Sequence, residues 1–409
     1  MVRSTSCPPR KRITSQLSAL IPSERASHTY AQSASFDGWQ LICRLLLTLA
    51  VSLAPPLLIT ANGQSHDPQA SFKPLPSEHS PTETSAQRWQ SGIHVLEHAG
   101  FRRTFRLHVP SGSNPTIPGP LILMFHGWGG DENEFLGAHD VVAAANARGY
   151  TLLAPVGLGA EEPGNSRASW AFRGSTTGLD GDGINAQVRD DTSLICDPKS
   201  TPDYTYPSCQ GIAQSTCGWT HCLTDDADFV IALVSAAKVH LPIDPNQIFA
   251  VGGSNGGMFV WDLAQNEKTA NHFGAFASLI GLPHRGYHQA PSVGSAKPML
   301  LITGGLDTTV PPGNWGDQRF TTTQNGESYF YTSASAIMLS WANALGCDTS
   351  VPAHTVAQDH NEIECRTWRR CNRTVDTREI LDCRAARMGH EYKLDITWPM
   401  VLDFFDQFR

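Results

Sequence analysis

The chain has 409 residues, of which 40% are hydrophobic, and a formal net charge of -8 at pH 7. This length and hydrophobic content predict a globular protein with a sizeable core and exclude a chain that is disordered throughout. The acidic balance, with a pI near 6.0, offers no basic surface to a polyanion, so we expect no nucleic-acid partner.

Residues 1–63 are interpreted as an N-terminal extension that ends in a signal peptide. The apolar run Leu45–Ile59 follows Arg44, and Ala61-Asn62-Gly63 places small residues where signal peptidase cleaves, which predicts cleavage before Gln64. The run is shorter than the roughly 20 apolar residues of a membrane-spanning helix. A signal anchor is the alternative. If the signal is cleaved, we expect a secreted, extracellular protein without stable membrane association.

Residues 64–88 are rich in Ser, Pro, Thr and His and poor in apolar side chains, which predicts a linker rather than a folded segment. Residues 89–409 are expected to form one domain, and the protein is expected to be a monomer. In this domain short apolar runs alternate with segments of helical spacing. That alternation predicts an α/β fold, with a mostly parallel central sheet and helices on both faces.

The individual elements follow from the same patterns. Strands are predicted at Phe101–Val109, Leu121–Phe125, Tyr150–Ala154, Ile248–Val251, Ala275–Ile280 and Met299–Thr303. Helices are predicted at Val141–Arg148, Asp226–Val239, Met258–Gln265, Ile337–Leu345 and Trp398–Phe408. Two stretches interrupt the alternation, Gly157–Thr224 and Asn314–Ser333, and are interpreted as loop insertions.

Cysteine usage indicates an oxidising compartment. Eight cysteines follow the targeting region, an even set without zinc-ligand spacing, and four of them fall in the first insertion. We therefore expect a disulfide-stapled loop insertion over the active site, and we predict a bond between Cys217 and Cys222. Asn372-Arg373-Thr374 is a glycosylation sequon consistent with the secretory route.

Ser254 is the predicted nucleophile. Gly252-Gly253-Ser254-Asn255-Gly256 follows the strand Ile248–Val251 and precedes a helix, the setting in which a tight turn exposes a serine hydroxyl. Glycines two residues to either side of the serine are expected because a side chain there would collide with the strand or the helix. A glycine-rich turn with an idle serine is the alternative.

A serine nucleophile requires a base that is oriented by an acid. Asp307 follows the predicted strand Met299–Thr303, at the sheet edge where Ser254 is expected, although it is also suited to capping a turn. His390 follows Gly389 near the last helix and is the preferred base. The order of serine, acid and histidine matches that of hydrolases on a parallel sheet.

The oxyanion of a tetrahedral intermediate needs two backbone N–H donors. Asn255, directly after the nucleophile, and Trp128, in the glycine-rich loop after the strand Leu121–Phe125, are the candidates. His126 in the same loop is interpreted as a structural hydrogen-bonding residue. Trp128, Trp170, Phe172 and Trp315 are candidates for stacking on substrate rings, with core packing as the alternative for each.

Together these segments resemble the secreted esterases that include feruloyl esterases, acetylxylan esterases and short polyhydroxybutyrate depolymerases. The resemblance covers about residues 92–409 and is carried by the loop at 125–130, the elbow at 252–257, the turn at 304–311, the late Gly389-His390 and the cysteine-flanked Trp219. It implies the α/β-hydrolase fold, a catalytic triad of Ser254, Asp307 and His390, and no metal or organic cofactor. Tyr392 stands near a tryptophan position of that family, and residues 314–331 have no counterpart that indicates the acyl group.

The predicted function is hydrolysis of carboxylic esters, with feruloyl or acetyl esters of plant cell-wall polysaccharide ranked first. A polyhydroxyalkanoate polyester is the second candidate substrate. A serine peptidase and a non-catalytic secreted binding protein are the alternatives from other classes. A peptidase should cleave peptides faster than aryl esters, whereas a binding protein should show no hydrolysis that depends on Ser254.

Overall fold

The computed structural model describes residues 87–409 except 115, 165–166, 176–194, 198, 203, 205, 211–216, 289, 317–318, 357–361 and 372–378. The predicted signal peptide, most of the predicted linker and the sequon Asn372-Arg373-Thr374 lie outside the described residues. Within the part that is described, no helix combines the length and hydropathy required to cross a bilayer.

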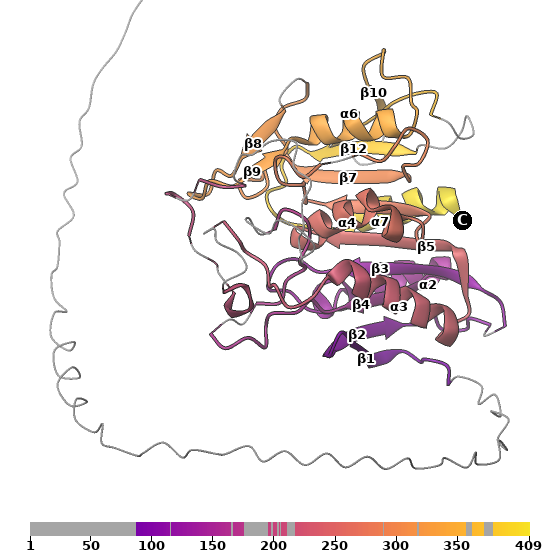
Figure 1. The fold of residues 1–409 in the computed structure, drawn as a ribbon. Helices are drawn as coiled ribbons and strands as arrows, with labels where there is room; N and C mark the ends of the chain where they lie inside the picture. The colour runs from indigo at the N-terminus through magenta and orange to yellow at the C-terminus, as the bar shows by residue number, and fades with distance from the viewer. Residues whose placement is uncertain are drawn as a thin grey trace, which may run out of the picture. The chain divides into compact units, whose positions relative to one another are not determined.

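Ten of the described strands form one sheet, in the order β1-β2-β4-β3-β5-β6-β7-β12-β11-β10 (Figure 1). The central strands from β4 to β12 run parallel, whereas β1, β2, β10 and β11 pair antiparallel at the two edges. The bounds are β1 Gly92–His98, β2 Phe101–His108, β3 Gly119–Phe125, β4 Thr151–Pro155, β5 Ile243–Gly253, β6 Ala275–Leu279, β7 Met299–Gly304, β10 His354–Val356, β11 Ile363–Thr367 and β12 Ile380–Ala385.

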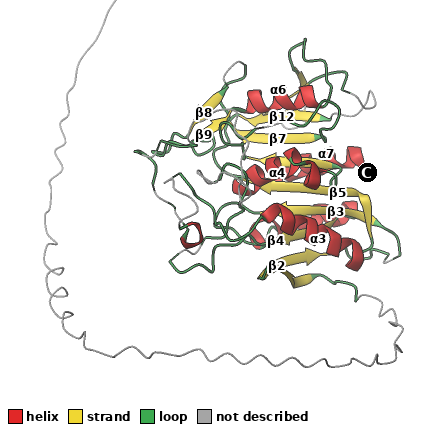
Figure 2. Cartoon of the chain, viewed as in Figure 1, coloured by secondary structure: helices red, strands yellow, loops and turns green. Residues whose placement is uncertain are grey.

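Helices cover both faces of this sheet (Figure 2). One face is covered by α3 (Asp226–His240), α4 (Asn255–Gln265), α5 (Glu267–Ala270) and α6 (Ala334–Ala344), and the other by α1 (Asn133–Leu136), α2 (His139–Arg148) and α7 (Leu394–Phe405). Strand β3 feeds both cores, because Leu121 and Leu123 pack into the first and Ile122 and Met124 into the second. This architecture is the α/β-hydrolase fold, as predicted.

Every predicted strand and helix is present, with ends shifted by a few residues. The prediction missed β1, the short helices α1 and α5, and the strands β10, β11 and β12. The last omission matters most, because β12 lies beside β7 in the parallel part of the sheet and leads to His390.

The two insertions pack against each other. The second contains a separate hairpin of β8 (Phe320–Thr322) and β9 (Phe330–Thr332). Its Phe330 N–H donates to Ile195 of the first insertion at 2.8 Å, and Cys196 forms an isolated β-bridge with Tyr329. The first predicted insertion, which contains the cysteines, is therefore present, and it packs beside the hairpin of the second.

The predicted bond between Cys217 and Cys222 is wrong. Cys196 pairs with Cys217 and Cys209 with Cys222, while Cys347–Cys371 and Cys365–Cys383 link elements near the C-terminus. The segment between Cys217 and Cys222 bonds along its length to residues 169–175, through the N–H groups of Trp219 and His221. Held in this way, it directs its two cysteines to partners elsewhere in the insertion.

Candidate active site

Ser254 lies in a strained turn between β5 and α4. Its backbone has φ 52° and ψ -116°, a left-handed conformation that non-glycine residues rarely adopt, and its N–H donates to Leu279 O at 2.9 Å. A Cβ on Gly252 would lie 2.2 Å from Gly256 O, and one on Gly256 would lie 2.1 Å from Phe125 O. The glycines on either side are therefore required by the backbone, as the sequence predicted.

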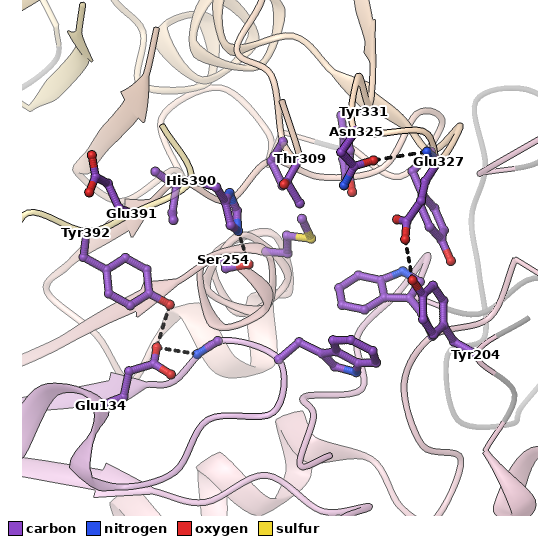
Figure 3. Close-up of a pocket in the computed structure, with 17 residues that line it drawn as sticks. Glu134, Tyr204, Ser254, Thr309, Asn325, Glu327, Tyr331, His390, Glu391 and Tyr392 are labelled. Atoms are coloured by element: carbon purple, nitrogen blue, oxygen red, sulfur yellow. Dashed lines mark hydrogen bonds between the residues drawn. The ribbon is translucent and has the colours of Figure 1, made fainter. Parts of the chain in front are cut away.

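The three predicted side chains Ser254, His390 and Asp307 meet at the carboxyl edge of the sheet (Figure 3 shows the Ser254–His390 bond). His390 Nε2 lies 2.9 Å from Ser254 Oγ, and His390 Nδ1 lies 2.8 Å from Asp307 Oδ2. The other carboxylate oxygen of Asp307 accepts the N–H groups of Thr309 and Val310, each at 2.8 Å. Asp307 thus favours the tautomer with the proton on Nδ1, which leaves Nε2 free to take the serine proton.

Ser254 opens into a pocket of about 600 Å³ whose lining is rich in tryptophan and tyrosine side chains (Figure 3). Polar groups occupy separate parts of the wall: Glu134 and Glu391 on the side of His390, and Asn325 and Glu327 on the hairpin insertion. The aromatic lining consists of Trp128, Tyr204, Trp219, Tyr329, Tyr331 and Tyr392. A cavity of this size and lining accommodates a drug-sized organic group.

Both insertions contribute to the aromatic wall. Trp219 Nε1 donates to His284 Nε2 at 3.0 Å, and the opposite ring nitrogen of His284 bonds to Phe330 O at 3.1 Å. His284 therefore joins the first insertion to the hairpin, and burial lowers its pKa to about 4, so it is neutral at pH 7. Tyr204 donates a short hydrogen bond to Glu327 at the rim of the same pocket, and burial raises the pKa of Tyr204 to about 12.

The free energy of unfolding should depend on pH through His284. Between pH 6.5 and about 4 the unfolded imidazole binds a proton that the folded one does not, so its stabilising contribution is complete above pH 6.5 and declines below it. The expected slope is about 1.4 kcal/mol per pH unit. Asp382, whose pKa burial raises to about 6, acts in the opposite direction over an overlapping range.

Because these groups oppose each other, the test compares wild type with His284→Gln in denaturant titrations at several pH values. The destabilisation caused by the substitution should shrink steadily as the pH falls from 6.5 towards 4. A difference that stays constant across this range would contradict a neutral buried imidazole.

The loop that carries Trp128 is held by buried hydrogen bonds. His126 Nε2 accepts the Gly157 N–H at 2.9 Å, and its Nδ1 donates to Gly127 O at 2.7 Å. Burial lowers the pKa of His126 to about 4, which keeps the ring neutral and able to make both bonds. His126 is thus a structural hydrogen-bonding residue in this fold.

Two predicted substrate-binding residues lie away from the pocket. Trp170 is fully buried, stacks on Phe259 at 5.4 Å and donates its indole N–H to His126 O, so it is a core residue and the prediction is wrong. Trp315 packs against the guanidinium groups of Arg366 and Arg384, at 4.0 and 3.7 Å, and is not part of the lining of the Ser254 pocket. The aromatic candidate Phe172 is also buried in the core.

A buried ion pair lies beneath the Trp219 segment. Arg103 and Asp226 are both fully buried, with 2.8 Å between Nη2 and Oδ1, and the second carboxylate oxygen of Asp226 contacts His221 and accepts the Ala171 N–H. Burial alone would raise the pKa of Asp226, but Arg103 and His221 hold it below its ordinary value. This cluster ties the start of α3 to the loop behind the pocket.

The residues that sequence reasoning missed are the pocket's polar and tyrosine side chains. Tyr329 and Tyr331 fall in the stretch 314–333, which the sequence identifies only as a loop insertion, and Tyr392 is noted there only as a departure from a family pattern. Glu134, in the short helix α1, and Glu327, in the hairpin insertion, carry no signal in the sequence, because acidic residues are usually solvated. Among the described residues, no group of three or more His, Cys, Asp or Glu is arranged to hold a metal ion.

Comparison with solved structures finds esterases. An acetyl xylan esterase from Aspergillus awamori is 13% identical, with a TM-score of 0.47, covering 77% of this chain and 99% of its own. An S-formylglutathione hydrolase from Agrobacterium tumefaciens is 10% identical, with a TM-score of 0.43; the match covers 78% of this chain and 95% of the hydrolase. Esterase 2 of Thermogutta terrifontis is 15% identical, with a TM-score of 0.34; the match covers 54% of this chain and 74% of the esterase. No protein-family model and no curated protein matches the sequence.

Proposed function

We propose that the chain is a secreted serine hydrolase of carboxylic esters, acting on feruloyl or acetyl esters of plant cell-wall polysaccharide. The observation that carries the proposal is the position of the His390 imidazole, within hydrogen-bond distance of both Ser254 Oγ and Asp307. Export is supported by the four disulfides of the described residues, a content typical of oxidising compartments.

The proposed mechanism is a two-step acyl transfer. His390 Nε2 takes the Ser254 proton as Oγ attacks the ester carbonyl, and the imidazolium then gives the proton to the departing alcohol. Asp307 orients the ring and stabilises its positive charge. The N–H groups of Trp128 and Asn255 are the proposed oxyanion donors, and water releases the acid through the same histidine.

The pocket favours an acyl group larger than acetyl. Trp219, Tyr329 and Tyr331 offer flat apolar surfaces. Asn325 and Glu327 add polar groups on the insertion that carries the two tyrosines. A hydroxylated aromatic acid, with a ring to stack and a phenolic hydroxyl to donate, matches that combination. Feruloyl esters are therefore ranked above acetyl esters.

The deciding experiment measures kcat and KM for methyl ferulate, p-nitrophenyl acetate, acetylated xylan, polyhydroxybutyrate and a peptide anilide. Methyl ferulate should give the highest kcat/KM among the natural ester types. Trp219→Ala should raise KM for methyl ferulate about tenfold and change KM for p-nitrophenyl acetate by less than about threefold, since only the larger acyl group meets the indole.

Trp315→Ala is the matched control, because Trp315 lies outside the pocket lining, and it should leave both substrates unaffected. Faster cleavage of the peptide would favour a peptidase, and faster cleavage of polyhydroxybutyrate would favour a polyester hydrolase. An equal effect of Trp219→Ala on the two small esters would exclude an acyl-binding role for this wall.

A further inference from the structure

One carboxylate oxygen joins the two loops that carry the proposed oxyanion donor and the proposed base. Glu134 Oε1 accepts the Gly127 N–H at 2.7 Å and the Tyr392 hydroxyl at 2.5 Å, drawn in Figure 3 as the two dashed lines that meet at Glu134. Gly127 directly precedes Trp128, and Tyr392 follows His390 by two residues. A single side chain of α1 therefore fixes the separation of these loops.

The surrounding packing leaves the Tyr392 ring little freedom. The ring stacks on Phe135 with centroids 5.4 Å apart, and a Cβ on Gly253 would lie 2.3 Å from it. It is thus wedged between α1 and the residue that precedes Ser254. Burial raises the pKa of Glu134. Burial together with the Glu134 carboxylate raises the pKa of Tyr392, so the Tyr392 hydroxyl stays protonated and serves as a hydrogen-bond donor.

Peptide geometry links Glu134 to the oxyanion. The peptide between Gly127 and Trp128 is planar and trans, so the Trp128 N–H points opposite to Gly127 O. Gly127 O is held by His126 Nδ1, and Gly127 N–H is held by Glu134. With both polar atoms of Gly127 fixed, the direction of the next N–H is fixed as well.

We propose that Glu134 and Tyr392 are positioning residues, which set the Trp128 N–H relative to Ser254 and His390 through the two hydrogen bonds at Glu134 Oε1. The inference rests on the proposed function and extends it to residues without direct chemistry. The role is geometric: it needs an acceptor oxygen at this point, not a negative charge, and it is independent of the acyl group.

Three substitutions separate these features. Glu134→Ala removes both bonds and should lower kcat about 100-fold on p-nitrophenyl acetate and on methyl ferulate alike, with KM within about threefold, as for loss of an oxyanion donor. Glu134→Gln keeps an amide oxygen that can accept both bonds and should restore kcat to within about fivefold of wild type. Tyr392→Phe removes one bond and should lower kcat about tenfold.

The rate at which a fluorophosphonate labels Ser254 is a second readout, because it uses the same nucleophile and oxyanion donors without a particular acyl group. The labelling rate should be lowest in Glu134→Ala, higher in Tyr392→Phe and highest in Glu134→Gln, the same order as kcat. Melting temperatures check folding; if Glu134→Ala does not fold, the contrast between Glu134→Gln and Tyr392→Phe supports or overturns the inference by itself.

Wild-type kcat in Tyr392→Phe and in Glu134→Ala would overturn the positioning role. So would equal losses in Glu134→Ala and Glu134→Gln, which would assign the effect to charge, or losses confined to KM for methyl ferulate, which would assign it to the pocket wall. A wild-type protein that neither hydrolyses esters nor reacts with the fluorophosphonate would instead defeat the proposed function, so the two failures are distinguishable.

Discussion

Ser254→Ala should lower kcat/KM for ester hydrolysis by about 10⁵-fold or more, because the proposed acyl intermediate forms on the Ser254 hydroxyl. His390→Ala should cost a similar factor, since the hydroxyl loses the base that lies 2.9 Å away. The double variant should be no slower than either single variant, because the two side chains act as a unit. The residual rate comes from the remaining oxyanion donors and from substrate binding.

The measurement is a progress curve with p-nitrophenyl acetate on purified protein, together with labelling by a fluorophosphonate. Ser235→Ala is the matched control, because Ser235 is an exposed serine on α3 whose hydroxyl donates to Ile231 O of the same helix. It should retain full activity and labelling. Esterase activity that survives Ser254→Ala unchanged would remove the assignment of the nucleophile.

The largest effect on stability is expected from Asp226→Ala. This substitution leaves the Arg103 guanidinium buried without its counter-ion and should lower the free energy of unfolding by about 3–5 kcal/mol. It also removes the acceptor of the Ala171 N–H and the partner of His221. Denaturant titration monitored by tryptophan fluorescence provides the measurement.

A double-variant cycle separates charge from packing. Arg103→Met alone and Asp226→Leu alone should each destabilise strongly, because each leaves one buried charge without its counter-ion. The combination Arg103→Met with Asp226→Leu should cost much less than the two single losses added together, since it leaves neither charge unpaired. Simple additivity of the two losses would show that the pair contributes no mutual stabilisation.

Sequence reasoning was successful where chemistry depends on local pattern. The strand, glycine-rich turn and helix around Ser254 are contiguous in the chain, so the elbow could be predicted with its glycine requirement. Asp307 follows a strand that opens with four apolar residues, Met299–Ile302, and its place at the sheet edge follows from that strand alone.

The strand that leads to His390 was not predicted, for a physical reason. Strand β12 contains Asp382 and Arg384, which are unexpected in a strand buried on both faces. In the fold Arg384 donates to Gly313 O at 2.6 Å and to Ser335 Oγ at 2.8 Å, and it packs on Trp315. These long-range contacts make burial possible, and no local pattern reveals them.

The roles of the tryptophans were beyond local pattern as well. Whether Trp170 or Trp219 lines the pocket depends on which side of an irregular loop each occupies, and long-range hydrogen bonds together with the disulfides hold that loop in place. The pairing itself involved cysteines 21 and 13 residues apart rather than the nearest neighbours. The spacing of the cysteines therefore indicated where the insertion lies in the chain, but not which of its side chains line the pocket.

The β-bridge at Cys196 joins the two insertions into one wall that is separate from the strand ends carrying the proposed triad. The proposed triad residues lie just beyond the ends of sheet strands, whereas most of the surrounding aromatic wall belongs to two loop insertions that are hydrogen-bonded to each other. Replacement of loop side chains can therefore change which esters fit the pocket without changing the proposed triad. The same division makes the loops the natural place to redesign selectivity.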